Sequence, residues 1–373
     1  MPETSTTPES AAVDRPELRK ILQEMVDSGF LGVTLRVNTP EGEWTGAAGL
    51  AERDGTATPP VDGHIRVGSN TKTFTAALAL LLVTEGVLEL DAPVAKTLTD
   101  YELDDRITLR MLLQHTSGVF NFTGEIYEDG TFVPGVPFQG KEWVEGRFKS
   151  YAPEELARLA LSKPARFEPG ADWSYANTNY TLVRLLIAKA TGRPFADEMR
   201  RLVLDPLELT GTSVPEGATD LPEPHAHAYY RYEDGGTERI VDVTRQDPSW
   251  ISTGGDMVST TADLRTFITA LVTGRLVPAD LLAEMLTTHP KAGYGLGVFV
   301  QEPVPGVQVV THNGGIAGHG ALMFTTTDGA TTLTAGLNYT DDKDLSMSVP
   351  FQKAVADLLP AVFGGGRSTE TQA

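Results

Sequence analysis

A serine and a lysine one helical turn apart are the residues of this sequence best placed to act together chemically. Ser69 and Lys72 open an apolar run that begins Val67-Gly68-Ser69-Asn70-Thr71-Lys72. A serine at a helix N-terminus lies beside unpaired backbone N–H groups, which stabilise a developing oxyanion. A desolvated lysine on the same helix face can accept the serine proton. The pair therefore indicates nucleophilic catalysis, although a serine N-cap followed by an unrelated lysine gives the same pattern.

Two further polar clusters could complete such a site. Tyr175 and Asn177 stand before a helical run, where a phenol can relay a proton and an amide can hold both a lysine and a carbonyl. The other cluster is Thr311-His312-Asn313-Gly314-Gly315, directly after the apolar run 307–310. Its glycines allow a strand backbone to approach an acyl group and to offer N–H groups to an oxyanion. Alone, the first of these clusters is better explained as a polar turn before a helix, and His312 of the second as a structural residue.

The elements that must position these residues follow a clear order along the chain. Periodicity predicts strands near both ends and a mostly helical middle. We therefore expect an α/β fold, in which an antiparallel sheet is flanked by terminal helices and carries an inserted helical domain. The expected helices are 15–27, 72–86, 108–114, 153–161, 180–191, 261–273, 278–286 and about 345–359, and the expected strands are 31–37, 44–50, 307–310, 321–326 and 331–337. The predicted domains are 14–68 with 262–363 for the sheet and 69–261 for the helices, between a disordered segment 1–13 and a flexible tail 364–373.

Composition excludes several classes of function. The 373 residues carry a formal net charge of −20, which disfavours nucleic-acid binding, and no apolar run approaches the length of a membrane span. Because there is no cysteine, disulfides and thiolate sites are excluded. Residues 1–13 lack the features of a signal peptide, so we expect a cytoplasmic protein, or a secreted one if the chain was trimmed. Oligomeric state is left open.

The three clusters, in this order and at these separations, resemble the serine D-alanyl-D-alanine carboxypeptidase and class C β-lactamase superfamily of penicillin-recognising enzymes. The similarity extends from about residue 15 to 362 and includes three further segments: Leu112-Leu113-Gln114-His115-Thr116-Ser117-Gly118, Ser252-Thr253-Gly254-Gly255-Asp256-Met257-Val258-Ser259-Thr260 and Gly293-Tyr294-Gly295-Leu296-Gly297. It implies a β-lactamase-like fold with the site in a cleft between the two domains.

The resemblance also implies a role for each matched residue. Ser69 forms an acyl-enzyme, Lys72 and Tyr175 move protons, and Asn177 orients the lysine and the substrate. His312 supports Tyr175 through a hydrogen bond. The N–H groups of Ser69 and Gly315 form the oxyanion hole. His115 shapes the turn at Ser117 and Gly118. The remaining positions expected to bind substrate are Asn313, Gly314, Trp250, Phe120 and Thr116.

The pattern departs from the carboxypeptidases at the contacts that would hold a substrate's terminal carboxylate. The third motif has Asn313 and Gly315 where the family carries threonines, and residues 298–301 contain no arginine. A charge-assisted contact contributes roughly 1.5–3 kcal/mol, so strict carboxypeptidase activity is disfavoured. The leading hypothesis is a D-stereospecific peptidase of carboxypeptidase type. The alternatives are an esterase, an acyltransferase that releases or cyclises peptides, and a non-catalytic penicillin-binding sensor; expected partners are small peptides, esters or β-lactams.

Other chemistries have little support in the sequence. No serine lies in a G-x-S-x-G elbow, and there is no H-E-x-x-H motif. His225 and His227 have no companions at metal-ligand spacing and are interpreted as surface loop. We therefore expect neither a cofactor nor a metal.

Overall fold

A computed structural model describes residues 14–127 and 129–365 of the chain. The expectation of disorder over 1–13 and most of the predicted flexible tail lie outside these residues. The described helices are α1 (Pro16–Asp27), α2 (Thr71–Thr84), α3 (Leu109–Gln114), α4 (Gly140–Gly146), α5 (Pro153–Leu161), α6 (Asn177–Thr191), α7 (Phe195–Met199), α8 (Thr261–Val272), α9 (Ala279–Leu286) and α10 (Ser348–Phe363), with short helical turns at Gly68–Asn70, Val94–Lys96, Arg200–Leu204, Pro248–Trp250 and Ser252–Gly254.

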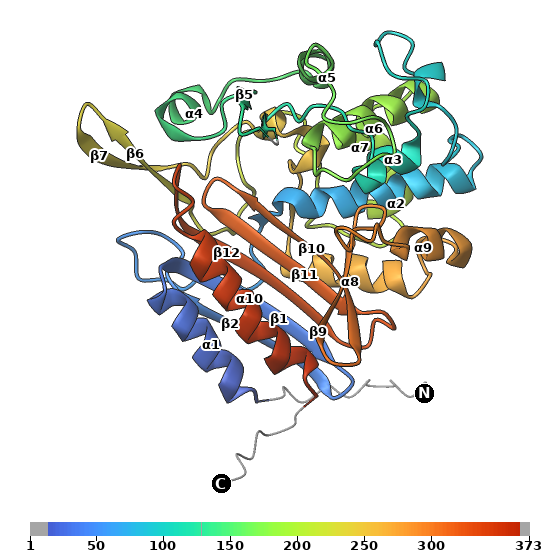
Figure 1. Ribbon diagram of the computed structural model, residues 1–373. Coiled ribbons are helices and arrows are strands. Elements are labelled where there is room, and N and C mark those ends of the chain that lie inside the picture. Colours follow the sequence, from blue (N-terminus) through green and yellow to red (C-terminus); the bar gives the residue numbers. More distant parts are fainter. Residues whose placement is uncertain (1–13, 128, 366–373) are drawn as a thin grey trace, which may run out of the picture.

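The main sheet unites strands from both ends of the chain, as the sequence predicts. Its antiparallel path runs β2-β1-β12-β11-β10-β9 (Figure 1). The N-terminal hairpin thus pairs with the last strand of the chain, Leu35 standing opposite Ala335. The strands are β1 (Phe30–Thr39), β2 (Gly42–Gly49), β9 (Phe299–Val304), β10 (Val307–Ile316), β11 (His319–Thr326) and β12 (Thr332–Asp342). The α/β fold with an antiparallel sheet is confirmed.

The middle of the chain, for which only helices were expected, also contributes strands. The hairpin of β6 (Tyr229–Asp234) and β7 (Thr237–Asp242) joins the sheet because β6 pairs in parallel with the end of β12, where Asp341 faces Tyr230. Two smaller pairs are β3 (Ile65–Arg66) with β8 (Val258–Ser259) and β4 (Gly124–Ile126) with β5 (Phe132–Pro134). The predicted domain boundaries at 68/69 and 261/262 stay a prediction.

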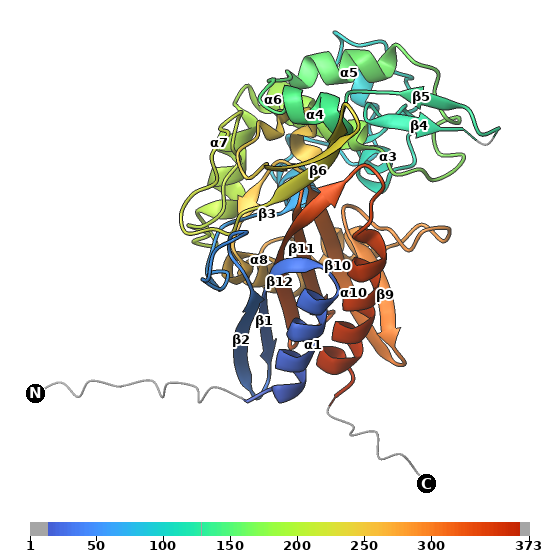
Figure 2. The same ribbon diagram turned by 90° about the vertical axis from the view of Figure 1, so that its left-hand side faces the viewer.

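Helices cover both faces of the sheet. Alternating residues of β11 explain this: Leu322 and Phe324 belong to the core under α1 and α10, whereas Ala321 and Met323 belong to the core that includes α8 and α2. This period of two is what a strand buried on both faces requires. Seen along the sheet, α1 and α10 lie together on one side and α8 lies on the other (Figure 2).

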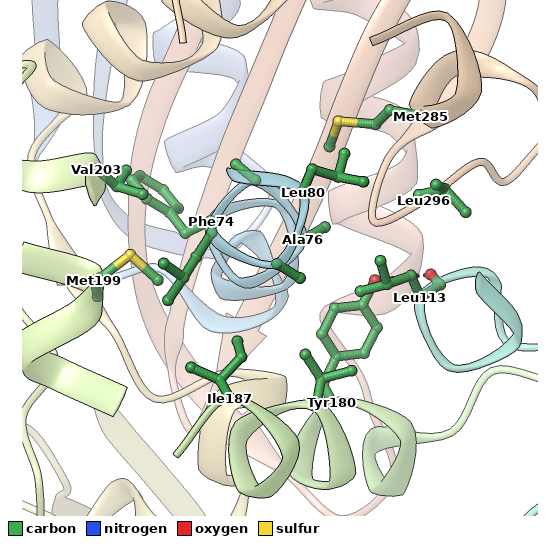
Figure 3. Packing of buried hydrophobic residues seen from close by; sticks show 14 of the residues in the cluster. Phe74, Ala76, Leu80, Leu113, Tyr180, Ile187, Met199, Val203, Met285 and Leu296 are labelled. Atoms are coloured by element: carbon green, nitrogen blue, oxygen red, sulfur yellow. Dashed lines mark hydrogen bonds between the residues drawn. The ribbon is translucent and has the colours of Figure 1, made fainter. Parts of the chain in front are cut away.

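Helix α2 is the centre of the helical region. Its sequence TKTFTAALALLLVT is apolar around nearly its whole circumference, and most of its side chains are buried. Figure 3 shows Tyr180 and Ile187 of α6 on one side of it and Leu296 on another. A helix enclosed in this way fixes its first turn, so the side chain of Lys72 is fully buried at the edge of the core.

Candidate active site

Ser69 is placed by a backbone-to-backbone contact between its own loop and β10. The helical turn Gly68–Asn70 leads into α2, and Gly68 has a positive φ of 50°. A Cβ on Gly68 would lie 2.4 Å from the backbone nitrogen of Gly315, and a Cβ on Gly314 would lie 1.9 Å from the carbonyl oxygen of Val67. Only glycines allow this approach. The first and third motifs of the sequence therefore meet in space.

Lys72 contacts the nucleophile directly. Its Nζ lies 3.1 Å from Ser69 Oγ, 2.8 Å from Asn177 Oδ1 and 2.5 Å from the carbonyl oxygen of Gly254. Burial lowers the pKa of Lys72 well below its ordinary value, and the opposing effect of Asp256 is smaller. The two carbonyl oxygens can only accept hydrogen bonds. Both therefore accept from the lysine amine, and when this amine is neutral its lone pair can take the serine hydroxyl proton, as a general base does.

Tyr175 and Asn177 complete the contacts around the lysine. The ring centroid of Tyr175 lies 4.6 Å from Lys72 Nζ. Burial raises the pKa of Tyr175, and its hydrogen bond with Ser69 acts in the opposite direction. Asn177 begins α6, and its backbone N–H donates to Asn121 Oδ1 at 3.1 Å. The structure thus brings Ser69, Lys72, Tyr175 and Asn177 together as the sequence predicts.

His312 lies at the same site but with a different partner from the one expected. Its Nε2 is 3.2 Å from the hydroxyl of Tyr294, and its Nδ1 is 2.8 Å from the carbonyl oxygen of Asn313. No hydrogen bond to Tyr175 is found among the described residues; the two rings lie 6.5 Å apart between centroids. Burial, followed by Lys72, lowers the pKa of His312 to about 3. The neutral imidazole therefore donates from Nδ1 and accepts the Tyr294 hydroxyl proton at Nε2.

His115 positions Tyr175 and Ala176 through a hydrogen bond and a ring contact. It caps α3 with a left-handed φ of 64° and is fully buried. Its Nδ1 accepts a hydrogen bond from the backbone N–H of Ala176 at 3.2 Å, and its ring packs on Tyr175 with centroids 4.4 Å apart. The expected influence on the Ser117–Gly118 turn is indirect, since Ser117 Oγ donates to Asn179 Oδ1, whose amide nitrogen lies 3.0 Å from His115 Nδ1.

An open cavity of about 540 Å³ lies in front of Ser69. Of the expected positions, Tyr175, Trp250 and residues 312–315 line it. Lys72, Asn177, Thr116 and Phe120 do not. Phe120 packs behind Trp250 in a buried cluster, and the carbonyl oxygen of Thr116 accepts from Gly170. The rest of the lining comes from residues that the motifs did not indicate: Phe138, Gln139, Phe299, Ile316, Ala317, Tyr339, Asp341, Leu345, Met347, Ser348, Phe351 and Gln352.

Behind Lys72 lies a buried charge that the sequence did not indicate as functional. Burial raises the pKa of Asp256 to about 7, although Arg184 lies 3.5 Å from its carboxylate. When ionised, Asp256 favours the protonated form of Lys72. The ionisation of Asp256 and that of Lys72 are therefore linked.

Two other expectations concern sites away from the cavity. Within 14–127 and 129–365, no group of three or more potential metal ligands is found. His227 Nδ1 instead lies 2.7 Å from Asp242 Oδ2, and both histidines are half-buried rather than fully exposed. Among the described helices, none combines the length and apolar character needed to cross a bilayer.

A cleft that holds a helix-borne serine and a buried lysine of lowered pKa is the site of a serine acyl-transfer enzyme. Comparison with known families agrees with this geometry. The family model described as Beta-lactamase matches residues 18–350. The chain belongs to the Beta-lactamase family.

Individual relatives give a finer comparison. A D-stereospecific amidohydrolase from a Streptomyces species is 34% identical, with a TM-score of 0.77, and 91% of this chain aligns with 99% of that one. A D-amino acid amidase from Ochrobactrum anthropi SV3 is 26% identical, with a TM-score of 0.79 over 95% of this chain and 99% of that one. Penicillin-binding protein 4* of Bacillus subtilis is 23% identical over 76% of this chain and 62% of its own length. The chain spans about two thirds or less of the length of the curated relatives it matches.

Proposed function

We propose that this protein is a serine hydrolase that cleaves amide or peptide bonds next to a D-amino-acid residue through an acyl-enzyme at Ser69. The observation that carries the proposal is the 3.1 Å contact between Ser69 Oγ and the buried amine of Lys72. The D-configuration rests on the two solved structures described above, a D-stereospecific amidohydrolase and a D-amino acid amidase, whose whole chains align with this one.

In the proposed reaction, Lys72 and Tyr175 each transfer a proton during acylation, and these transfers are reversed during deacylation. Ser69 Oγ attacks the substrate carbonyl while its proton passes to Lys72, and the N–H groups of Ser69 and Gly315 bind the resulting oxyanion. Tyr175 then protonates the leaving amine as the carbon–nitrogen bond breaks. A water or an amine next attacks the ester of Ser69, and the proton transfers run in reverse.

The cavity disfavours a substrate with a free carboxylate on the leaving group. None of its described lining residues is a lysine or an arginine, and His312 is neutral at physiological pH. A carboxylate that enters such a cavity loses hydration without gaining a charged partner. Amides therefore fit the site better than the D-alanyl-D-alanine terminus of a cell-wall peptide.

Steady-state kinetics test this proposal. We expect D-phenylalanine amide to have a kcat/KM at least about 100-fold above that of L-phenylalanine amide and above that of an N-acyl-D-alanyl-D-alanine peptide. The methyl ester of D-phenylalanine serves as the matched ester, because amides and esters share one acyl-enzyme. A cleavage rate confined to esters would identify an esterase, and turnover of the D-alanyl-D-alanine peptide alone would restore the carboxypeptidase hypothesis.

A further inference from the structure

The same cavity holds a carboxylate that the reaction described above does not use. Asp341 lines it together with Ser69, at the end of β12. Two residues earlier on the strand, Tyr339 also lines the cavity, so both side chains lie on one face of the sheet. A Cβ on Gly315 would lie 3.7 Å from the Tyr339 hydroxyl, which places this part of β12 beside the proposed oxyanion hole.

Strand register tells which half of a substrate Asp341 would face. Gly315 pairs with Gly320 of β11, and Gly320 pairs with Leu337 of β12. Because β10 and β12 run in the same direction, Asp341 lies past the Gly315 end of β10, whereas His312 lies before it. In the proposed reaction the leaving group is protonated by Tyr175, beside His312. The acyl half of the substrate therefore extends the other way, toward Asp341.

Asp341 and its neighbour Asp342 differ in their ionic partners. Asp342 is paired with Arg231 at 2.6 Å, but no lysine, arginine or histidine among the described residues forms an ion pair with Asp341. One of its oxygens accepts the backbone N–H of Asp342 at 2.9 Å. Burial raises the pKa of Asp341 to about 6, so it is ionised at neutral pH. A half-buried carboxylate in a cavity attracts a cation more strongly than one in open water.

The surroundings define the rest of the ligand. Shortly after Asp341 in the sequence, the chain enters α10. Three apolar residues of this segment also line the cavity: Leu345, Met347 and Phe351. Trp250 and Phe138 stack on one another, with ring centroids 6.1 Å apart, and line the same cavity. An ammonium group attached to an apolar body matches these walls and the carboxylate together.

We propose that Asp341 binds the free α-ammonium group of the acyl donor, so that the enzyme acts on N-terminal, unblocked D-amino-acid residues with apolar side chains. This inference rests on the proposed function, because it assigns the acyl side of the cavity from that mechanism. It makes Asp341 a specificity-determining residue and gives it no part in proton transfer.

Matched substrate pairs test this assignment. The 4-nitroanilides of D-phenylalanine and N-acetyl-D-phenylalanine share a leaving group and differ in the cationic amine. For the native protein we expect kcat/KM to be about 10- to 100-fold higher for the free amine. In Asp341→Asn that preference should fall to about 3-fold or less, with the acetylated substrate and an uncharged 4-nitrophenyl ester cleaved at their native rates.

Asp344→Asn is the matched control, since Asp344 is exposed on the following turn, does not line the cavity and carries the same charge. It should keep the full preference. Equal rates on both anilides in the native protein, or a parallel loss on both in Asp341→Asn, would overturn the inference while leaving the proposed function intact. If the native protein cleaves neither anilide nor the ester and Ser69 resists a fluorophosphonate, the proposed function itself has failed, and the inference with it.

Discussion

The amine of Lys72 lies 3.1 Å from the hydroxyl of Ser69 and exposes none of its surface to solvent. These two facts belong together, because burial is what makes the lysine a base. Burial disfavours the charged ammonium more than Asp256 favours it, so the pKa of Lys72 falls. The fold therefore supplies the chemistry by enclosing α2 on all sides.

Replacement of either residue of this pair should abolish turnover. For Ser69→Ala and Lys72→Met we expect kcat to fall by about 10³-fold or more, because nucleophile and base act as one unit. The double variant should be scarcely slower than either single one. These losses are measured as kcat on D-phenylalanine amide, and circular dichroism checks that each variant is folded. A double variant in which the two losses multiply would show that the residues act independently.

The pH profile should show an acidic limb that belongs to Lys72. Its pKa is lowered by burial, so the active neutral amine forms as pH rises through that lowered value, well below 10.5. We expect kcat/KM to rise with pH along this limb and to reach its plateau far below pH 10. A limb that begins only near the ordinary lysine value would contradict a buried general base.

The buried carboxylate behind the lysine should set the position of that limb. Ionised Asp256 raises the pKa of Lys72, so Asp256→Asn should move the acidic limb of kcat/KM to lower pH. The shift is expected only above a pH of about 7, where Asp256 is ionised. Asp205→Asn, an exposed position with no side-chain hydrogen bond among the described residues, is the charge-matched control. A shift of equal size in both variants would assign it to net charge alone.

The contact between the nucleophile loop and β10 should not tolerate a single methyl group. Gly314→Ala would place a Cβ 1.9 Å from the carbonyl oxygen of Val67 and 2.6 Å from the nitrogen of Ser69. We expect activity to fall by at least about 100-fold and the free energy of unfolding to fall by about 1–3 kcal/mol. In Gly146→Ala the Cβ has open space, so rate and thermal midpoint should both be preserved. A Gly314→Ala enzyme of native activity would mean that the loop can move away.

His115 should affect kcat rather than KM. His115→Leu removes the acceptor that holds the Ala176 N–H, so Tyr175 loses its support without any change in the cavity lining. We expect kcat to fall about 10- to 100-fold with KM within about 3-fold of native. His115→Asn offers a side-chain oxygen to the same N–H and should recover part of the loss. A rise in KM without a change in kcat would instead give His115 a role in binding.

A site residue could be predicted from the sequence where a local pattern of residues fixes its position. Ser69 and Lys72 are fixed by helical spacing, and Gly314 by a strand that only a glycine could bring so close to the nucleophile loop, so these three could be predicted. The sheet followed from strands at both ends of the chain. The β6–β7 hairpin was not expected, and its parallel pairing with β12 had no pattern in the sequence to indicate it.

Contacts that depend on tertiary packing could not be predicted from the sequence. His312 bonds to Tyr294 rather than to Tyr175, since the loop before β9 brings that hydroxyl within 3.2 Å. Thr116 and Phe120 follow the left-handed turn at His115 and lie behind the cavity wall, although they are near the motif in sequence. Asp341 has no motif around it and reaches the cavity only because β12 is long enough to extend past the end of β10.

Peptide mass spectrometry after brief reaction with a D-phenylalanine ester tests the central claim most directly. The account predicts a phenylalanyl adduct on the peptide that contains Ser69, formed in the native protein and missing in Ser69→Ala. An adduct on another serine, or one that persists when Ser69 is replaced, would contradict it.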